Sequence, residues 1–282
     1  GGITATGASE SNYNVKYDGS GTLTLKGASI NRYHSFDVSS GTNSAAIYAA
    51  GDLNLVLEET STVGGDAANG IYTTGSLTIS GTGTANITIA AEGGCGIFAS
   101  SSLTAQSGSI TVAATGSNSC GISAASVTVN GGTVNAQGYV IGLLSQSTIS
   151  VSTGNLTGKG GVGVFSITTL SVSGGTVVGT SEESVDDGYS FGIYTLKSLT
   201  ITGGSVTGTG VEAGVVAAED INISGSSILT ATGTGTTGNS YGVAVQGDVT
   251  VAGTPDVTAT GYTAGMVLVE NKLFTLNGSD SL

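Results

Sequence analysis

Positive charge is scarce in this sequence. Only 6 of the 282 residues are Lys or Arg, against 19 Asp and Glu, which gives a formal net charge of −13. A protein that binds nucleic acid needs basic patches to neutralise phosphates, and an anionic membrane surface makes the same demand. We therefore expect neither as a partner. Because no apolar run reaches the ~20 residues of a spanning helix, we also expect no insertion into a membrane.

Histidine and proline are each present once, and tryptophan is absent. His34 lies close to the single arginine, Arg32, and no nucleophile motif accompanies them. Enzymes that degrade pectin need a strong base beside acids, or converging acids with basic residues, and Lys159, Lys197 and Lys272 are scattered along this sequence. We therefore predict that the chain is not an enzyme. A polysaccharide lyase or hydrolase is the alternative.

Glycine, in contrast, is abundant, with 49 residues, and hydrophobic residues make up 38% of the chain. Charged residues make up 9%, whereas a disordered chain combines low hydrophobicity with high charge. No linker rich in proline or charge divides the sequence, so we expect one folded domain. The first residues are Gly1 and Gly2, which favours a processed or trimmed chain.

A repeat runs through most of the sequence. The segment 70–79 (GIYTTGSLTI) recurs as 192–201 (GIYTLKSLTI). The same register begins ten times, at intervals of 21 to 29 residues. An aliphatic residue or methionine follows each start, and these residues should form one buried column. They are Ile47, Ile71, Ile97, Ile122, Leu143, Val164, Ile193, Val215, Val243 and Met266.

Each repeat shows signs of three short strands. Alternating apolar and polar residues, as in 77–79 (LTI), indicate a strand with one buried face, and a glycine-rich corner as in 131–134 (GGTV) precedes a third strand. Stacked coils would pair each strand with its equivalent ~4.8 Å away and share one core. We therefore predict an all-β fold, a single-stranded, right-handed parallel β-helix of about 10–11 coils.

Both ends of such a rod need protection, because open β-edges polymerise. We expect an N-terminal cap at residues 1–22, repeats over 23–264, and a last coil with a C-terminal cap at 265–282, in a monomer. Two long repeats carry insertions at 180–188 and 233–240, at the same corner. In repeat proteins such insertions often lie on the binding face.

Aromatic residues recur two positions after the repeat start. Tyr48, Tyr72 and Phe98 come from consecutive coils, and by alternation with the inward aliphatic residue they should point outward. An exposed apolar column often marks a binding site, and sugars stack on flat aromatic surfaces. We therefore predict that these three rings bind carbohydrate. Ring-on-ring stacking that only stabilises the rod is the alternative.

Acidic residues gather at corners of the predicted coils. One group lies on a single long loop, and another pair precedes two successive repeat starts by four residues. Oxygen-rich loops bind calcium, which takes roughly six to eight oxygen ligands. A solvated acidic corner that keeps the rod soluble is the alternative. The candidate ligands are Glu182, Glu183, Asp186, Asp187, Asp66 and Glu92.

The two cysteines, Cys95 and Cys120, each stand directly before a repeat start on adjacent coils. We expect them to be neighbours in one ladder, at a separation that a disulfide tolerates. Because Ile141, Val162 and Phe191 occupy the same column, we expect it to point inward. A reduced, buried pair and a disulfide both remain open.

The repeats resemble a known family. The segments 70–81 (GIYTTGSLTISG) and 200–210 (TITGGSVTGTG) are similar to those of bacterial surface β-helix proteins called carbohydrate-binding domain-containing proteins, which occur in anaerobic gut and cellulolytic bacteria. The resemblance runs over residues 46–282. It implies a secreted or wall-attached protein that binds acidic or plant polysaccharide, sometimes with calcium.

We therefore predict a non-catalytic, adhesin-like protein at the cell surface or outside the cell, which binds polysaccharide on a lateral face of the rod. Calcium is the one cofactor that we expect. An ice-binding solenoid is a second alternative, because rows that contain threonine recur at 155–157, 205–207 and 256–258. Ice-binding faces need regular threonine ranks, and these rows are mixed.

Overall fold

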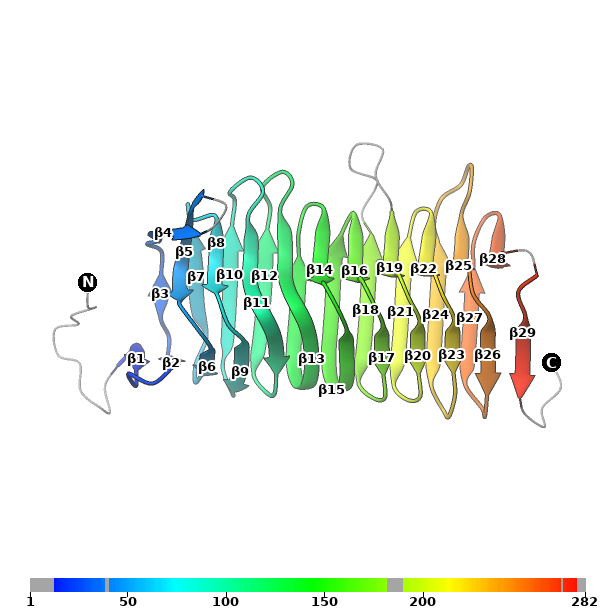
Figure 1. Ribbon diagram of the computed structural model, residues 1–282, viewed down its shortest axis with the longest axis horizontal. Coiled ribbons are helices and arrows are strands. Elements are labelled where there is room, and N and C mark those ends of the chain that lie inside the picture. Colours follow the sequence, from blue (N-terminus) through cyan, green and yellow to red (C-terminus); the bar gives the residue numbers. More distant parts are fainter. Residues whose placement is uncertain (1–12, 39–40, 182–189, 270, 278–282) are drawn as a thin grey trace.

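The computed structural model describes residues 13–38, 41–181, 190–269 and 271–277. Within these residues the protein is all-β and has no helix, so the described part also has no helix that could cross a membrane. The chain winds as a parallel β-solenoid of about nine turns into a rod, with β1 (Val15–Tyr17) at one end and β29 (Phe274–Asn277) at the other (Figure 1). The predicted fold class is confirmed. Each ladder described below stacks 10 or 11 strands, which equals the predicted number of coils. About nine turns of the chain connect these strands.

Three parallel ladders run along the rod, and the longest strands bend round corners to serve more than one of them. The first ladder consists of β5 (Gly41–Ala49), β8 (Asn69–Thr73), β11 (Cys95–Ala105), β13 (Cys120–Gln137), β14 (Ile141–Ser145), β16 (Val162–Ser166), β19 (Phe191–Thr195), β22 (Ala213–Ala217), β25 (Tyr241–Val245) and β28 (Ala264–Leu268).

The second ladder includes three strands of only three residues, β17 (Leu170–Val172), β20 (Leu199–Ile201) and β23 (Ile221–Ile223). Its members are β2 (Thr22–Leu25), β6 (Leu53–Leu57), β9 (Leu77–Gly81), β11, β13, β15 (Ile149–Gly160), β17, β20, β23, β26 (Val249–Ala252) and β29.

The third ladder has longer strands after its first member. Its members are β3 (Ser29–Ile30), β7 (Ser61–Gly65), β10 (Thr84–Ile89), β12 (Ser109–Ala114), β13, β15, β18 (Thr176–Ser181), β21 (Ser205–Gly210), β24 (Ile228–Gly233) and β27 (Asp256–Thr260).

The core is the inside of the rod, where apolar side chains of all three ladders meet. The predicted aliphatic column is confirmed from Ile47, which is 7% exposed, to Val243, which is fully buried. Met266, in the last coil, is half-buried. Burying a side chain of this size stabilises the fold by about 1.5–3 kcal/mol. Each coil therefore gains its stability from the coils on either side of it.

Glycine serves two different purposes in the coils. At the repeat starts it allows close approach, because a Cβ on Gly70 would lie 2.2 Å from Cγ2 of Ile87. At the corner before the third ladder it allows a left-handed backbone, with φ of +70° at Gly132 and +69° at Gly175. Positive φ therefore explains the glycines of the second group, and close packing explains those of the first.

Buried hydroxyl groups line the corner between the first and second ladders. Thr73, Ser145 and Thr195 are fully buried, and Ser166 is 1% exposed. The Ser166 hydroxyl donates to the Ser147 carbonyl at 2.7 Å, and the Thr195 hydroxyl donates to the Thr168 carbonyl. A buried carbonyl without a partner destabilises a fold, so these side chains satisfy the corner backbone from inside.

Two antiparallel strands end ladders at the N-terminal side of the rod. β1, inside the predicted cap, pairs with β2 from Val15↔Leu25 to Tyr17↔Leu23. β4 (His34–Val38), which lies beyond the predicted cap, pairs antiparallel with the first half of β5. Antiparallel pairing covers an edge that another parallel coil would otherwise extend.

Candidate functional site

The predicted ring ladder forms on the outside of the first ladder. Tyr48 pairs in register with Tyr72, and Tyr72 with Phe98. The ring centroids of Tyr72 and Phe98 lie 4.8 Å apart with 17° between the ring planes, so these rings stack. Tyr48 and Tyr72 are further apart, at 6.2 Å and 34°. The sequence therefore identified this run of neighbouring rings correctly.

A fourth ring covers part of the ladder. Phe36, on β4, stacks on Tyr48 with 4.0 Å between the centroids and lies 4.9 Å from the centroid of Tyr72. Tyr72 is only 9% exposed, whereas Tyr48 and Phe98 are half-buried. The expectation that all three rings are exposed is therefore wrong for Tyr72. Since a sugar stacks on a ring face, and neighbouring rings occupy much of these faces, the geometry suits packing better than binding.

A second group of rings lies on the middle coils, where no binding site was predicted from the sequence. Phe165 and Tyr194 stack at 5.0 Å with 4° between their planes, and Phe191 meets Tyr194 edge-on at 5.3 Å. Ile167 and Leu196, two residues further along the chain in the bends that follow β16 and β19, are exposed. Phe165 and Tyr194 occupy the same column as Tyr48, so this register was the signal that could have found them.

The candidate calcium ligands do not gather into a site among the described residues. Asp66 and Glu92 are both exposed, and the Glu92 carboxylate accepts a hydrogen bond of 3.4 Å from Asn118. In the described part of the chain, no three His, Cys, Asp or Glu side chains lie close enough to hold a metal ion. Calcium binding stays a prediction. The other four candidates lie outside the described residues: Glu182, Glu183, Asp186 and Asp187.

Other carboxylates, at the corner before the second ladder, cap the backbone of the next coil. Oδ1 of Asp52 accepts a hydrogen bond of 2.7 Å from the Ser76 amide. Oδ1 of Asp220 accepts from the Asp248 amide at 2.9 Å, and Oδ1 of Asp248 accepts from the Leu273 amide at 3.1 Å. Hydrogen bonds to an ionised acceptor are stronger than neutral ones, so these acids hold adjacent coils together.

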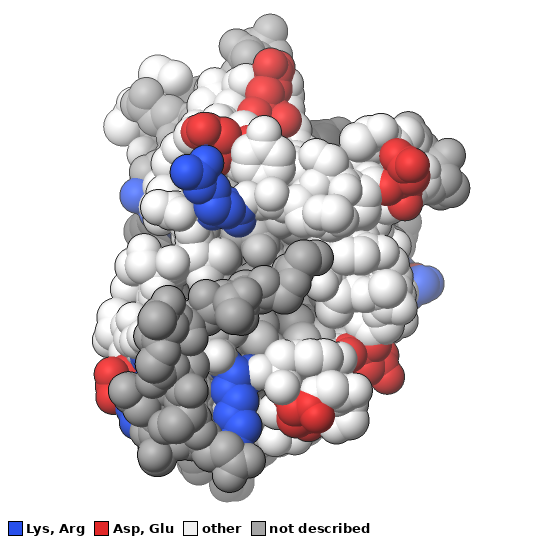
Figure 2. Space-filling model, turned by 90° about the vertical axis from the view of Figure 1, so that its left-hand side faces the viewer, with Lys and Arg blue, Asp and Glu red and all other residues white. Residues whose placement is uncertain are grey.

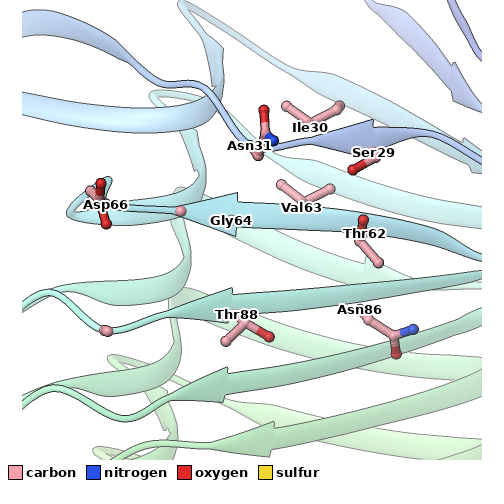
Figure 3. A pocket seen from close by; sticks show the side chains of 11 residues that line it. Ser29, Ile30, Asn31, Thr62, Val63, Gly64, Asp66, Asn86 and Thr88 are labelled. Atoms are coloured by element: carbon pink, nitrogen blue, oxygen red, sulfur yellow. The ribbon is translucent and has the colours of Figure 1, made fainter.

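A groove of about 340 Å³ opens on the third ladder near the N-terminal end of the rod (Figure 3). It exists because β3 has only two residues and ends before β7 does. Its polar side chains come from successive strands, with Asp66 standing apart at the turn that follows β7 (Figure 3). These side chains are Ser29, Asn31, Thr62, Asp66, Asn86 and Thr88.

The groove continues into what we call the polar face, the outward side chains of the third ladder. Its central column is in register over ten strands and carries hydroxyl or amide groups at every position except one valine. The column consists of Ser29, Thr62, Asn86, Thr111, Asn135, Thr157, Val178, Thr207, Thr230 and Thr258.

Two further columns flank this central one. The first consists of Thr84, Ser109, Thr133, Asn155, Thr176, Ser205, Ile228 and Asp256. The second consists of Thr88, Ala113, Gln137, Lys159, Thr180, Thr209, Thr232 and Thr260. Charge is sparse within these columns, where Lys159 and Asp256 are the charged members. The threonine rows proposed from the sequence lie on this face and remain mixed with other residues.

The two cysteines pair in register between β11 and β13, as predicted. Both are free thiols and half-exposed, so the expectation that this column points inward is wrong. The reason lies at Gly96, where a Cβ would lie 2.0 Å from Cγ1 of Val112 in the core. Because Gly96 and Ile97 both turn inward, the alternation shifts and Cys95 faces outward. The hydrogen bond between the two thiols lowers the pKa of Cys95 and raises that of Cys120.

Among the described residues, charged side chains do not form a patch of one sign at the N-terminal end. Figure 2 shows acidic and basic side chains scattered over the described surface there. His34 and Arg32 are both exposed, and His34 lies on β4 opposite Ala45. His34 is therefore an exposed residue near the N-terminal end of the rod.

A family model described as carbohydrate-binding domain-containing protein matches residues 2–236. The chain belongs to this family. The resemblance seen in the repeats is thereby confirmed, and so is carbohydrate binding as the general function. No curated protein and no solved structure matches the chain.

The match places the groove and most of the polar face inside the carbohydrate-binding domain. The coils after residue 236 continue the same ladders, because β25 pairs with β22 and β27 pairs with β24. The domain therefore presents one uninterrupted surface along its described length, whichever part of it the family model covers.

Proposed function

We propose that this carbohydrate-binding domain binds a polysaccharide along the polar face, with the groove at one end. The observation that supports this site is the set of in-register hydroxyl and amide columns. Hydroxyl and amide groups both donate and accept hydrogen bonds, as the hydroxyl groups of a sugar chain do. The second ladder offers only one such column, because β17, β20 and β23 are three residues long.

A polymer suits this surface because the surface itself repeats. Neighbouring strands in a ladder lie ~4.8 Å apart, so each coil presents the same groups at a constant interval. Each contact is weak, and contacts along one chain add through effective concentration. Affinity should therefore rise with the length of the saccharide, and single substitutions should have small effects.

The charge of the polymer decides whether calcium takes part. The polar face has almost no cations to pair with the carboxylates of an acidic plant polysaccharide. Calcium ions bridge carboxylates through oxygen ligands, so an acidic polymer would need calcium to bind here. A neutral polymer would bind equally well with calcium or with a chelator.

Two variants with matched chemistry test the site. The polar-face variant replaces groups on four successive coils, namely Asn86→Ala, Thr111→Val, Asn135→Ala and Thr157→Val. The control variant makes similar changes on the second ladder, namely Asn54→Ala, Thr78→Val, Thr104→Val and Thr128→Val. Affinity electrophoresis in xylan, soluble cellulose derivatives and polygalacturonate, each with calcium or a chelator, measures binding.

We expect the polar-face variant to bind at least about tenfold more weakly, since each lost hydrogen bond contributes about 0.5–1.5 kcal/mol. The control should bind like the parent. Equal binding by the two variants would contradict the site. A third variant, Tyr48→Ala with Phe98→Ala, tests the ring ladder, and loss of binding there alone would assign binding to the rings.

We further propose that the protein is non-catalytic, adhesin-like and located at the cell surface or outside the cell. In support, the carboxylates of Asp52, Asp220 and Asp248 each accept a hydrogen bond from a backbone amide of the next coil, which is a structural role. Purified protein should release neither reducing sugars nor unsaturated products from pectin. Turnover that disappears when one acid is replaced would contradict this, and protease treatment of intact cells tests the location.

A further inference from the structure

A second cavity, of about 770 Å³, lies at the corner between the first and second ladders, away from the polar face. One wall is the hairpin of β1 and β2, and the other is the corner between β5 and β6. Small-molecule sites typically measure about 300–1,000 Å³ and combine apolar walls with a few polar groups. The cavity has this size and this composition.

Its apolar part suits the flat, C–H-rich side of a sugar ring. Leu23, Ile47 and Leu53 contribute aliphatic groups to the lining. Tyr17 is 60% exposed, so, in contrast to the stacked rings of the first ladder, it keeps a large open surface. Tyr48 adds a half-buried side chain. A tyrosine pairs an apolar ring with a hydroxyl, which is the combination that an amphipathic ligand meets best.

Its polar part is a carboxylate and a hydroxyl group. Asp52, the one charged residue of the lining, uses Oδ1 to hold the Ser76 amide and is exposed to solvent. A carboxylate has acceptor capacity for several hydrogen bonds, so Asp52 can also accept from ligand hydroxyl groups. The exposed Ser20 adds a second polar group to the rim. An anionic ligand would be repelled by Asp52.

The hairpin that carries Tyr17 and Ser20 is held in shape by Asp18. Its carboxylate accepts hydrogen bonds from the Ser20 amide at 2.7 Å and the Thr22 amide at 2.9 Å, and from the Ser20 hydroxyl at 2.7 Å. A turn fixed in this way presents its side chains without a further ordering cost on binding. The cavity wall is therefore preorganised.

We propose that this cavity binds a single neutral pyranose ring, as the end or a side branch of a glycan. The proposal rests on the carbohydrate-binding function, but it concerns a site separate from the polar face. The ring would place its apolar side against Tyr17 and its hydroxyl groups toward Asp52. One such site, away from the polymer-binding face, would favour particular chain ends or branches over uniform chains.

Saturation-transfer NMR with the methyl pyranosides of glucose, galactose, mannose and xylose tests the cavity, with glucuronic acid as the anionic probe. We expect saturation transfer to at least one neutral pyranoside and much weaker transfer to glucuronic acid. Tyr17→Ala should weaken binding about tenfold, since stacking on an exposed ring contributes on the order of 1 kcal/mol or more. Tyr17→Phe should keep most of the binding.

Asp52→Asn keeps an oxygen for the Ser76 amide but removes the charge. It should therefore weaken the binding of neutral pyranosides and reduce the discrimination against glucuronic acid. The four-residue polar-face variant separates this proposal from the proposed function, because it should lose polymer binding and keep pyranoside binding. The proposal is overturned if no pyranoside shows transfer, if Tyr17→Ala binds like the parent, or if glucuronic acid binds best.

Discussion

The ring of Phe36 stacks on the ring of Tyr48 at 4.0 Å between centroids, although β4 runs antiparallel to β5. This contact joins an element outside the repeat to the first coil of the repeat. It also buries Phe36 to 8% exposure, together with Tyr72. The aromatic cluster at this end of the first ladder is therefore part of how the rod is closed.

Replacing Phe36 should weaken this closure. Phe36→Ala removes a buried ring, and truncations of this type lower the free energy of unfolding by about 3–5 kcal/mol. Because each coil contacts mainly its neighbours, the loss should be concentrated in β4, β5 and β8. Hydrogen exchange of backbone amides measures it, with Phe36→Leu as the milder control. Unchanged protection in β5 would contradict the role of Phe36.

The buried hydroxyl groups should matter more than their exposed counterparts. Thr195→Val keeps the shape of the side chain but removes the hydroxyl that donates to the Thr168 carbonyl and accepts from the Lys197 amide. The Thr168 carbonyl keeps its bond from the Lys197 amide, so we expect a loss of about 0.5–1.5 kcal/mol in the free energy of unfolding for the hydrogen bonding of the hydroxyl. Thr200→Val, on the half-exposed outer side of β20, is the control and should change stability by less than about 0.5 kcal/mol. Denaturant titration compares the two.

The turn at Asp18 should respond to acid. Hydrogen bonds from the Thr22 and Ser20 amides and the Ser20 hydroxyl hold the pKa of Asp18 well below its ordinary value. The folded pKa is thus lower than the unfolded one, so the turn is fully stabilised above about pH 4 and loses that stabilisation as pH falls further. The amide chemical shifts of Ser20 and Thr22, recorded during an acid titration, measure this loss of the turn. Asp18→Asn should show no such transition, and an identical transition in that variant would contradict the assignment.

The thiol pair should form a disulfide when an oxidant is supplied. In-register residues of adjacent strands lie ~4.8 Å apart, inside the ~4.4–6.8 Å range of Cα separations in disulfides. With oxidised glutathione, two thiols lose two protons and two electrons, which reduce the glutathione disulfide to two thiols. Closing a loop of this length should raise the free energy of unfolding by up to about 3 kcal/mol. Mass spectrometry measures the loss of two hydrogens from the oxidised protein, and the Cys95→Ser variant, which should show no such loss, is the control. Two titratable thiols after treatment with oxidised glutathione would contradict the prediction.

The solenoid itself could be predicted from the sequence because its signal is periodic. Ile71, Ile97 and Ile122 recur in one register, and stacking equivalent strands is what buries them all. Phe36 could not be placed in this way, because it lies on an antiparallel strand outside the repeat. Its position over Tyr72 depends on a hairpin for which the sequence has no periodic sign.

The site was harder to predict than the fold for a related reason. Alternation assigns each side chain to the inside or the outside, and it failed at Cys95 because Gly96 and Ile97 both turn inward. It also does not show which outward column remains open. The rings of Tyr72 and Phe98 cover each other, whereas the side chains of Thr62 and Thr88 on the polar face are exposed, and only the structure distinguishes these outcomes.

The antiparallel strands β1 and β4 have a consequence for how the rod assembles. Each parallel strand finds its partner in the neighbouring coil, roughly one repeat away in sequence, so most pairings close only short loops. Loop closure of this length is entropically cheap, and a folded coil is a template for the next one. With two ladders blocked at the N-terminal end, growth of the structure has one direction. A coil that folds at this end can therefore template further coils only toward the C-terminal side of the rod.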